Sequence, residues 1–221
     1  MVYIFIYSMY YLTPPKKLSI NYSMKDYLNR FQSMVNQLEE HPKVQLVDFK
    51  VYSPVGNDVI ETIEKKLGHF LPADFKAFYQ VTNGIELSWR FSSQNNPFKT
   101  TEILQGKVTL RPIEEIFLNK KIDYQGFTID EIIEEGIAIG LYHIIDKGWK
   151  VSLQNRLASS RKINFETYLN FLIESKGLIR HREQFLGSFS AVALKYQNLG
   201  NLNQEAIYHS FPESNRGGAS I

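Results

Sequence analysis

The residues that could do chemistry in this chain are few and widely spaced. No cysteine occurs, so a thiolate nucleophile and a cysteine-bearing zinc site are excluded. No two of the five histidines share the i, i+4 spacing that places two imidazoles on one helix face for metal binding: His41, His69, His143, His181 and His209. Phosphate-binding and dinucleotide-binding glycine loops are absent, and Gly187 to Ser190 has no strand-turn-helix context. We therefore expect no enzyme activity, no metal and no cofactor.

Acidic residues are concentrated between 130 and 135 and are one candidate for a binding surface. This segment is expected to form a short acidic helix in which Thr128 and Glu131 make a capping box. One interpretation is an ordinary solvated face. The other is a surface that contacts a basic protein, whose association it would speed by charge complementarity. That surface would comprise the acidic residues of this segment and of a nearby one: Asp130, Glu131, Glu134, Glu135, Glu114 and Glu115.

The two tryptophans are natural interface anchors, because a buried indole can dominate binding energy. Trp89 and Trp149 both alternate with polar neighbours, however, as inward-facing strand residues do. We therefore favour a core position for both. Arg90 would then point to the opposite face of its strand, beside Glu86, and these two residues are predicted to lie on the surface as partner contacts.

The composition limits the classes of partner. The chain has 221 residues, of which 43% are hydrophobic and 22% charged, close to the averages for a globular domain that folds around a core. Lys and Arg number 25 against 23 Asp and Glu, and the net charge of +2 is too small and too scattered for binding to a phosphate backbone. Nucleic acid is therefore not expected as a partner. The lack of cysteine suits a reducing compartment, and we expect a cytoplasmic protein.

The first residues are unusually apolar. The segment 1–12 is as hydrophobic as the core of a signal peptide, but no Lys or Arg precedes it, and a bilayer span needs about 20 residues. We therefore expect no export signal and no stable membrane insertion. Two interpretations stay open: residues 1–23 are an apolar N-terminal extension, or translation starts at Met24, where an amphipathic pattern begins. We favour the second.

Hydrophobic periodicity predicts both helices and strands. Ser23 is a candidate N-cap, Asp58 and Glu61 resemble a capping box, and Asn83-Gly84 offers a left-handed end to a helix. Helices are expected at 23–38, 58–67, 72–81, 112–118 and 165–174. Strands are expected at 44–52 (with a bulge as one option), 85–90, 107–111, 137–142 and 149–153. No helix separates the last two strands, so their pairing should be antiparallel. Residues 92–105 are expected to form a loop, and 181–196 a further helix before a polar tail.

The segment IETIEKKLGHFLPADFKAFYQVTNGIEL, residues 60–87, is the most specific pattern in the chain. A helix ends in Leu-Gly, Leu-Pro opens a short aromatic helix, and Asn-Gly precedes a strand. This pattern resembles the SUKH superfamily, which includes the fungal Smi/Knr-type regulators and many bacterial relatives. The positions that carry the likeness are Ile63, Glu64, Leu67, Gly68, Leu71, Pro72, Phe75, Phe78, Asn83 and Gly84.

The resemblance implies a fold and a kind of function. It covers about 57–175 and implies an α+β fold, a mainly antiparallel sheet flanked by helices. We therefore expect a SUKH-like domain at 24–180, followed by a helix and polar tail at 181–221. Many bacterial members serve as immunity proteins that bind and silence secreted polymorphic toxins, so the expected function is non-catalytic binding of a cognate toxin, such as a basic nuclease. The alternative, implied by the fungal relatives, is a regulator or scaffold in cell-wall synthesis or signalling.

Overall fold

The fold is taken from a computed structural model, which describes residues 23–91, 105–118, 126–154, 157 and 160–187. The predictions for the apolar segment 1–12, for nearly all of the loop at 92–105 and for the tail after 187 fall outside these residues.

The described helices follow the predicted ones closely. The exception is the helix expected at 181–196. It begins earlier, at Ile179, and ends at Leu186, and the described residues end at 187. The helices are α1 (Met24–Glu40), α2 (Asn57–Leu67), α3 (Ala73–Tyr79), α4 (Ile113–Phe117), α5 (Phe165–Glu174) and α6 (Ile179–Leu186), with a 3-10 turn η2 (Ile133–Glu135).

The strands form two antiparallel sheets. The first has the order β1-β2-β3 and the second the order β4-β5-β6, so neighbours in the sheet are also neighbours in the chain. The strands are β1 (Val44–Val51), β2 (Ile85–Phe91), β3 (Gln105–Leu110), β4 (Phe127–Ile132), β5 (Ile137–Ile144) and β6 (Gly148–Leu153). The predicted α+β class with a mainly antiparallel sheet is confirmed.

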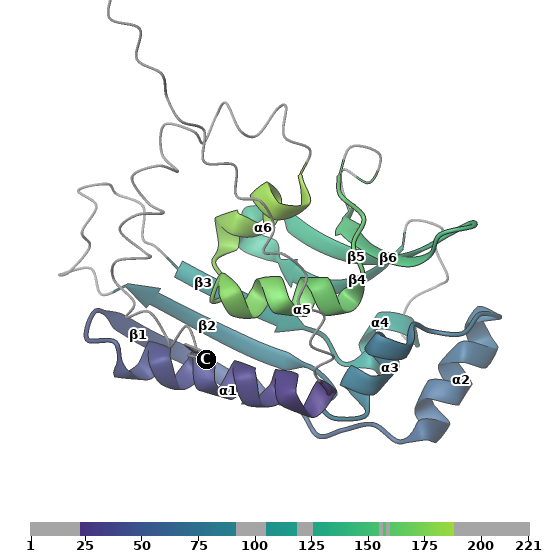
Figure 1. The fold of residues 1–221 in the computed structure, drawn as a ribbon, viewed down its shortest axis with the longest axis horizontal. Helices are drawn as coiled ribbons and strands as arrows, with labels where there is room; N and C mark the ends of the chain where they lie inside the picture. The colour runs from purple at the N-terminus through teal and green to yellow at the C-terminus, as the bar shows by residue number, and fades with distance from the viewer. Residues whose placement is uncertain (1–22, 92–104, 119–125, 155–156, 158–159, 188–221) are drawn as a thin grey trace, which may run out of the picture.

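Helices cover one side of the first sheet. In Figure 1, α1 runs along β1 and β2, and α5 lies between α1 and the second sheet. Strand β2 alternates accordingly, because Ile85, Leu87 and Trp89 are buried toward the helices while Glu86 and Arg90 face away from them. Buried side chains from Tyr27 in α1 to Leu186 in α6 belong to one hydrophobic core. No helix among the described residues is long and apolar enough to cross a membrane.

Several local signals determine element boundaries as predicted. Ser23 caps α1 in a reciprocal box, in which its Oγ accepts from the backbone N of Asp26 and the Asp26 carboxylate accepts from the backbone N of Ser23. Gly68 ends α2 in the left-handed conformation, with φ 68°. The bulge in β1 lies between Leu46 and Asp48.

Two other local predictions were wrong, and for Asn83 a tertiary contact is the reason. Helix α2 begins at Asn57 with Gly56 as N-cap, so Asp58 lies in the first turn and makes no capping hydrogen bond. Helix α3 ends at Gln80 in the right-handed conformation, before Asn83. The Asn83 side chain instead accepts from the backbone N of Ile113, at the start of α4, over 2.9 Å.

The two sheets meet along β3 and β4. The backbone N of Arg111, just after β3, donates to the carbonyl O of Ile129 in β4 over 3.1 Å. Beyond that point, the edge of β3 is bonded differently: the backbone N of Lys107 donates to the carbonyl O of Gly177 over 2.9 Å, and the backbone N of Thr109 donates to a side chain. The residues between α5 and α6 therefore replace part of a neighbouring strand.

Gly84 lies just before β2, at a position where a side chain does not fit. Its φ is 120°, and a Cβ there would lie 2.3 Å from the carbonyl O of Leu110. We expect Gly84→Ala to lower the free energy of unfolding by more than about 3 kcal/mol, because backbone strain and a clash with a neighbouring strand combine. Gly136→Ala is the matched control, since Gly136 also has positive φ, 64°, but a Cβ there meets nothing within 4 Å. That control should lose only about 1 kcal/mol in urea unfolding. Equal losses would contradict the clash.

Candidate partner-binding surfaces

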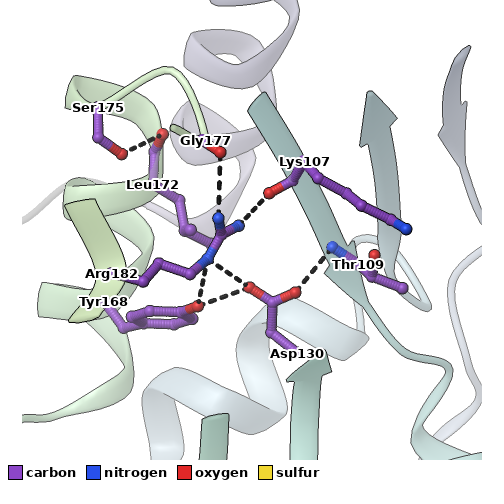
Figure 2. A network of polar contacts seen from close by, with 8 residues as sticks. All are labelled: Lys107, Thr109, Asp130, Tyr168, Leu172, Ser175, Gly177 and Arg182. Atoms are coloured by element: carbon purple, nitrogen blue, oxygen red, sulfur yellow. Dashed lines mark hydrogen bonds and ion pairs between the residues drawn. The ribbon is translucent and has the colours of Figure 1, made fainter. Parts of the chain in front are cut away.

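Asp130, predicted as a surface contact, lies in the interior. Its carboxylate is fully buried. One oxygen accepts from the backbone N of Thr109 over 2.8 Å, and the other accepts from the Tyr168 hydroxyl over 2.6 Å and from Arg182 Nε over 3.1 Å (Figure 2). A side chain in this position cannot touch a partner, so Asp130 is removed from the predicted surface.

Arg182 provides the positive charge that makes this burial possible. The guanidinium is itself fully buried, and its remaining donors go to the carbonyl oxygens of Gly177, over 3.1 Å, and of Lys107 (Figure 2). Burial alone would lower the pKa of Arg182, but the charge of Asp130 and the contact with Tyr168 outweigh it, and the net shift is upward. Burial, followed by the charge of Asp130, raises the pKa of the Tyr168 hydroxyl well above its ordinary value. The cluster is charged, closed to solvent and structural.

The segment around Asp130 is a strand and not the predicted acidic helix. Thr128 is buried in β4, where its hydroxyl donates to Gln154 over 2.8 Å, so it caps no helix. Glu131, on the other side of the strand, forms an ion pair with Arg111. Ile133 to Glu135 form a single 3-10 turn, in which Glu135 is exposed; the side chain of Glu134 lies outside the described set.

The remaining predicted residues occupy separate places. Glu114 accepts from the Asn83 side chain over 2.8 Å at the start of α4, whereas Glu115 is exposed. Glu86 and Arg90 lie on the outer face of β2, as predicted, where Glu86 accepts from Tyr52 and Arg90 donates to Gln45 over 2.9 Å. The predicted surface of six acidic residues is therefore not formed as expected, because Asp130 is buried and Glu131 and Glu114 are bonded to other side chains. A role in binding for those that reach the surface stays a prediction.

The tryptophans divide between core and surface. Trp89 is 1% exposed, and its Nε1 donates to the carbonyl O of Lys176 over 2.7 Å, so its core position is confirmed. Trp149 is only partly buried but packs against the hydrophobic core, so the core prediction holds for it in part. Its ring lies against those of His143 and Phe127, and its Nε1 donates to the carbonyl O of Phe70 over 2.6 Å.

This contact builds a surface that sequence reasoning missed. The loop between α2 and α3 lies against the β5-β6 hairpin, and the rings of His69 and His143 stack with their centroids 4.3 Å apart. Phe70 and Ile145 point outward, and both are 81% exposed. We call this the Phe70 surface: His69, Phe70, His143, Ile145 and Trp149. The sequence signal was the pair of turns at Gly68 and Gly148, but nothing in it showed that the two turns meet.

The stacked histidines do not amount to a metal site. Among the described residues, no group of three or more His, Asp or Glu side chains lies close enough together to hold a metal ion. The surface offers aromatic and aliphatic contact area.

A second unusual group lies on the outer face of the second sheet. The Tyr142 ring packs over Gly140 and Gly126, where added Cβ atoms would lie 2.7 Å and 2.3 Å from it. Tyr142 is 4% exposed, and its hydroxyl has no hydrogen-bond partner among the described residues. Burial raises the pKa of Tyr142 to about 12.

Comparison with known proteins places the central part of the chain in a family. Residues 54–157 match the family model described as SMI1 / KNR4 family (SUKH-1). No curated protein and no solved structure matches the chain. The matched range includes α2, α3 and β2 through β6, and hence every residue of the Phe70 surface. The resemblance inferred from the sequence is confirmed.

The buried ion pair can be tested by removing one charge. We expect Asp130→Asn to lower the free energy of unfolding by about 3–5 kcal/mol, because Arg182 is left buried without a counter-charge. Glu131→Gln, which breaks the neighbouring ion pair between two partly exposed side chains, should lose less than about 1 kcal/mol. Combining Asp130→Asn with Arg182→Met should cost less than the sum of the two single changes, as measured by urea unfolding. Additive losses would show that the two side chains act independently.

The raised pKa of Tyr142 should make the stability of the folded protein depend on pH in the alkaline range. The folded pKa, about 12, lies above the unfolded value of about 10, so the stabilising effect of protonation is complete below pH 10 and is lost as pH rises through 12. We expect Tyr142→Phe to be neutral or to stabilise by up to about 1 kcal/mol at pH 8, because the buried hydroxyl is unpaired. Its advantage over the unmodified protein should then increase modestly toward pH 11. Urea midpoints that fall in parallel for both proteins would refute the assignment.

Proposed function

We propose, from the SMI1 / KNR4 (SUKH-1) domain that the chain contains over residues 54–157, that this protein acts without catalysis, by binding another protein. In its most concrete form, it is an immunity protein that neutralises a cognate polymorphic toxin. The family match is the observation that carries this proposal, because its bacterial members include many proteins of that kind.

The described structure supports binding over catalysis. Its buried charges are satisfied by one another: Asp130 accepts three hydrogen bonds, and the Arg182 guanidinium donates to two backbone carbonyls besides. Such a cluster has no free base or acid to offer a substrate. The apolar side chains left on rigid turns are instead suited to contact with another macromolecule.

Neutralisation by binding needs only a stable, stoichiometric complex that covers or distorts the toxin. No cofactor would take part. The complex would form in the cytoplasm, where the protein must be present before the toxin acts. Affinity must then be high, and high affinity in a complex of ordinary size depends on a few well-placed apolar anchors more than on the total contact area.

The first test is to identify the partner. The tagged protein serves as bait in lysate from its own source, with Asp130→Asn, which is expected to destabilise the fold, as the control bait. We expect one protein at near-equal stoichiometry, retained by the wild type and lost with the control. That protein, expressed alone, should arrest growth, and co-expression of the present chain should restore it. Recovery of cell-wall or signalling enzymes would favour the regulator alternative. Recovery of no protein would reject the binding function.

A further inference from the structure

We propose that the Phe70 surface is the anchor by which this protein holds its partner, and that it fits an apolar pocket bordered by carboxylates on another protein. This inference rests on the proposed function, because it assumes that the chain binds a protein. It assigns the binding to a surface that none of the residues predicted from the sequence belongs to.

Phe70 is held outward by the loop on which it stands. Gly68 turns the chain out of α2 in the left-handed conformation, and its backbone N donates to the carbonyl O of Glu64 over 2.9 Å. The backbone N of Leu71 donates to the Glu64 carboxylate over 2.7 Å, and the Leu71 side chain is 3% exposed. Because Leu71 is fixed in the core, its neighbour Phe70 is held facing solvent, where it is 81% exposed.

The β5-β6 hairpin braces the same loop from the other side. The Trp149 indole donates to the carbonyl O of Phe70, and His143 stacks on His69. The hairpin turn is itself tight, since the backbone N of Lys147 donates to the carbonyl O of Ile144 over 3.0 Å and Asp146 adopts φ 64°. Ile145, on this turn, is 81% exposed. Two apolar side chains are thus displayed on two turns that are fastened together.

Such an arrangement suits binding because the backbone that carries the two anchors is already held by hydrogen bonds in the free protein. Burying a Phe or Ile side chain in a partner removes apolar surface from water. A flexible loop would lose part of that gain in becoming ordered on binding. Other exposed apolar residues exist, such as Val47 on the β1 bulge and Ile133 on the 3-10 turn. The Phe70 surface differs from these because the loop that carries Phe70 and the hairpin that carries Ile145 are held together. An indole hydrogen bond and a histidine stack connect them.

The charges around these turns indicate the partner's chemistry. The segments 64–76 and 143–150 contain five lysines, Lys65, Lys66, Lys76, Lys147 and Lys150, against three carboxylates, Glu64, Asp74 and Asp146. Two of the carboxylates and two of the lysines are engaged within the protein, since Lys66 Nζ donates to the carbonyl O of Phe117 over 3.0 Å and Lys76 pairs with a carboxylate. Glu64 pairs with Lys76 over 3.0 Å, and Asp74 accepts from the backbone N of Phe75 and of Glu166. Asp146 is the exposed one. The rim of the surface is therefore positive, and a complementary partner presents carboxylates around its pocket.

The test compares two pairs of surface substitutions on the full chain. The variant Phe70→Ser with Ile145→Ser removes both anchors. The matched control, Glu86→Gln with Arg90→Ser, changes two residues on the outer face of β2 that were predicted as contacts from sequence. Neither pair lies in the core, and equal urea midpoints would show that both variants are folded. The probe is the purified partner recovered with the wild-type bait, and binding is measured by biolayer interferometry.

We expect the anchor variant to bind at least tenfold more weakly, mainly through faster dissociation, and the control to bind as the wild type does. Reversing Lys65 and Lys147 to Glu should slow association and reduce its dependence on salt. A photoreactive phenylalanine analogue at position 70 should cross-link to a segment of the partner that is rich in Asp and Glu.

Other outcomes overturn the inference, and they separate it from the proposed function. If the partner binds the anchor variant as tightly as the wild type, the Phe70 surface is not the anchor, but the binding function stands. If only the control loses binding, the outer face of β2 is the contact. If no protein is recovered, and instead the wild type binds vesicles of phosphatidylserine and phosphatidylcholine through Phe70, the occupant is a membrane and both proposals fail. Concentration-dependent self-association abolished in the anchor variant would make the occupant a second copy.

Discussion

The buried ion pair between Asp130 and Arg182 is the interaction on which the rest of the structure depends. It lies where the two sheets meet, and there the edge of β3 is satisfied by side chains and by the turn before α6 (Figure 2). A backbone N and a carbonyl O that would pair with a strand in a continuous sheet are bonded instead to a carboxylate and a guanidinium. Both charges are fully buried, so each is stable only when paired with the other. Their ion pair therefore fixes α6 to the sheets.

This dependence shows that the folding unit is larger than the matched family range. Tyr168 and Arg182, which complete the cluster around Asp130, both follow residue 157, where the match ends. At the other end, the Tyr27 hydroxyl of α1 donates to Glu166 over 2.9 Å and accepts from Asn170 over 2.7 Å, so α1 is fastened to α5. Helices outside the family range therefore complete the core that the range begins.

The sequence predicted those parts of the fold that are determined locally. The N-cap at Ser23, the glycine that ends α2 and the alternation in β2 are each encoded within a few residues, and each was confirmed. The errors share a different cause. Asp130 was placed on a helix surface because its counter-charge is 52 residues away in the chain, and Asn83 was read as a helix end because its partners, in α4, are 30 residues away. Single-sequence patterns carry no information about such pairs.

The Phe70 surface could not be predicted from the sequence for the same reason, because the loop and the hairpin that form it are far apart in the chain. The contacts that fasten the α2-α3 loop to the hairpin use backbone groups, the Leu71 side chain, His69 and Trp149. Phe70 contributes its carbonyl oxygen to the hydrogen bond with Trp149, while its ring is 81% exposed and lies 5.8 Å, centroid to Nζ, from Lys76. Any residue supplies a carbonyl oxygen, so the hydrogen bond that holds the α2-α3 loop against the hairpin does not depend on which side chain stands at position 70.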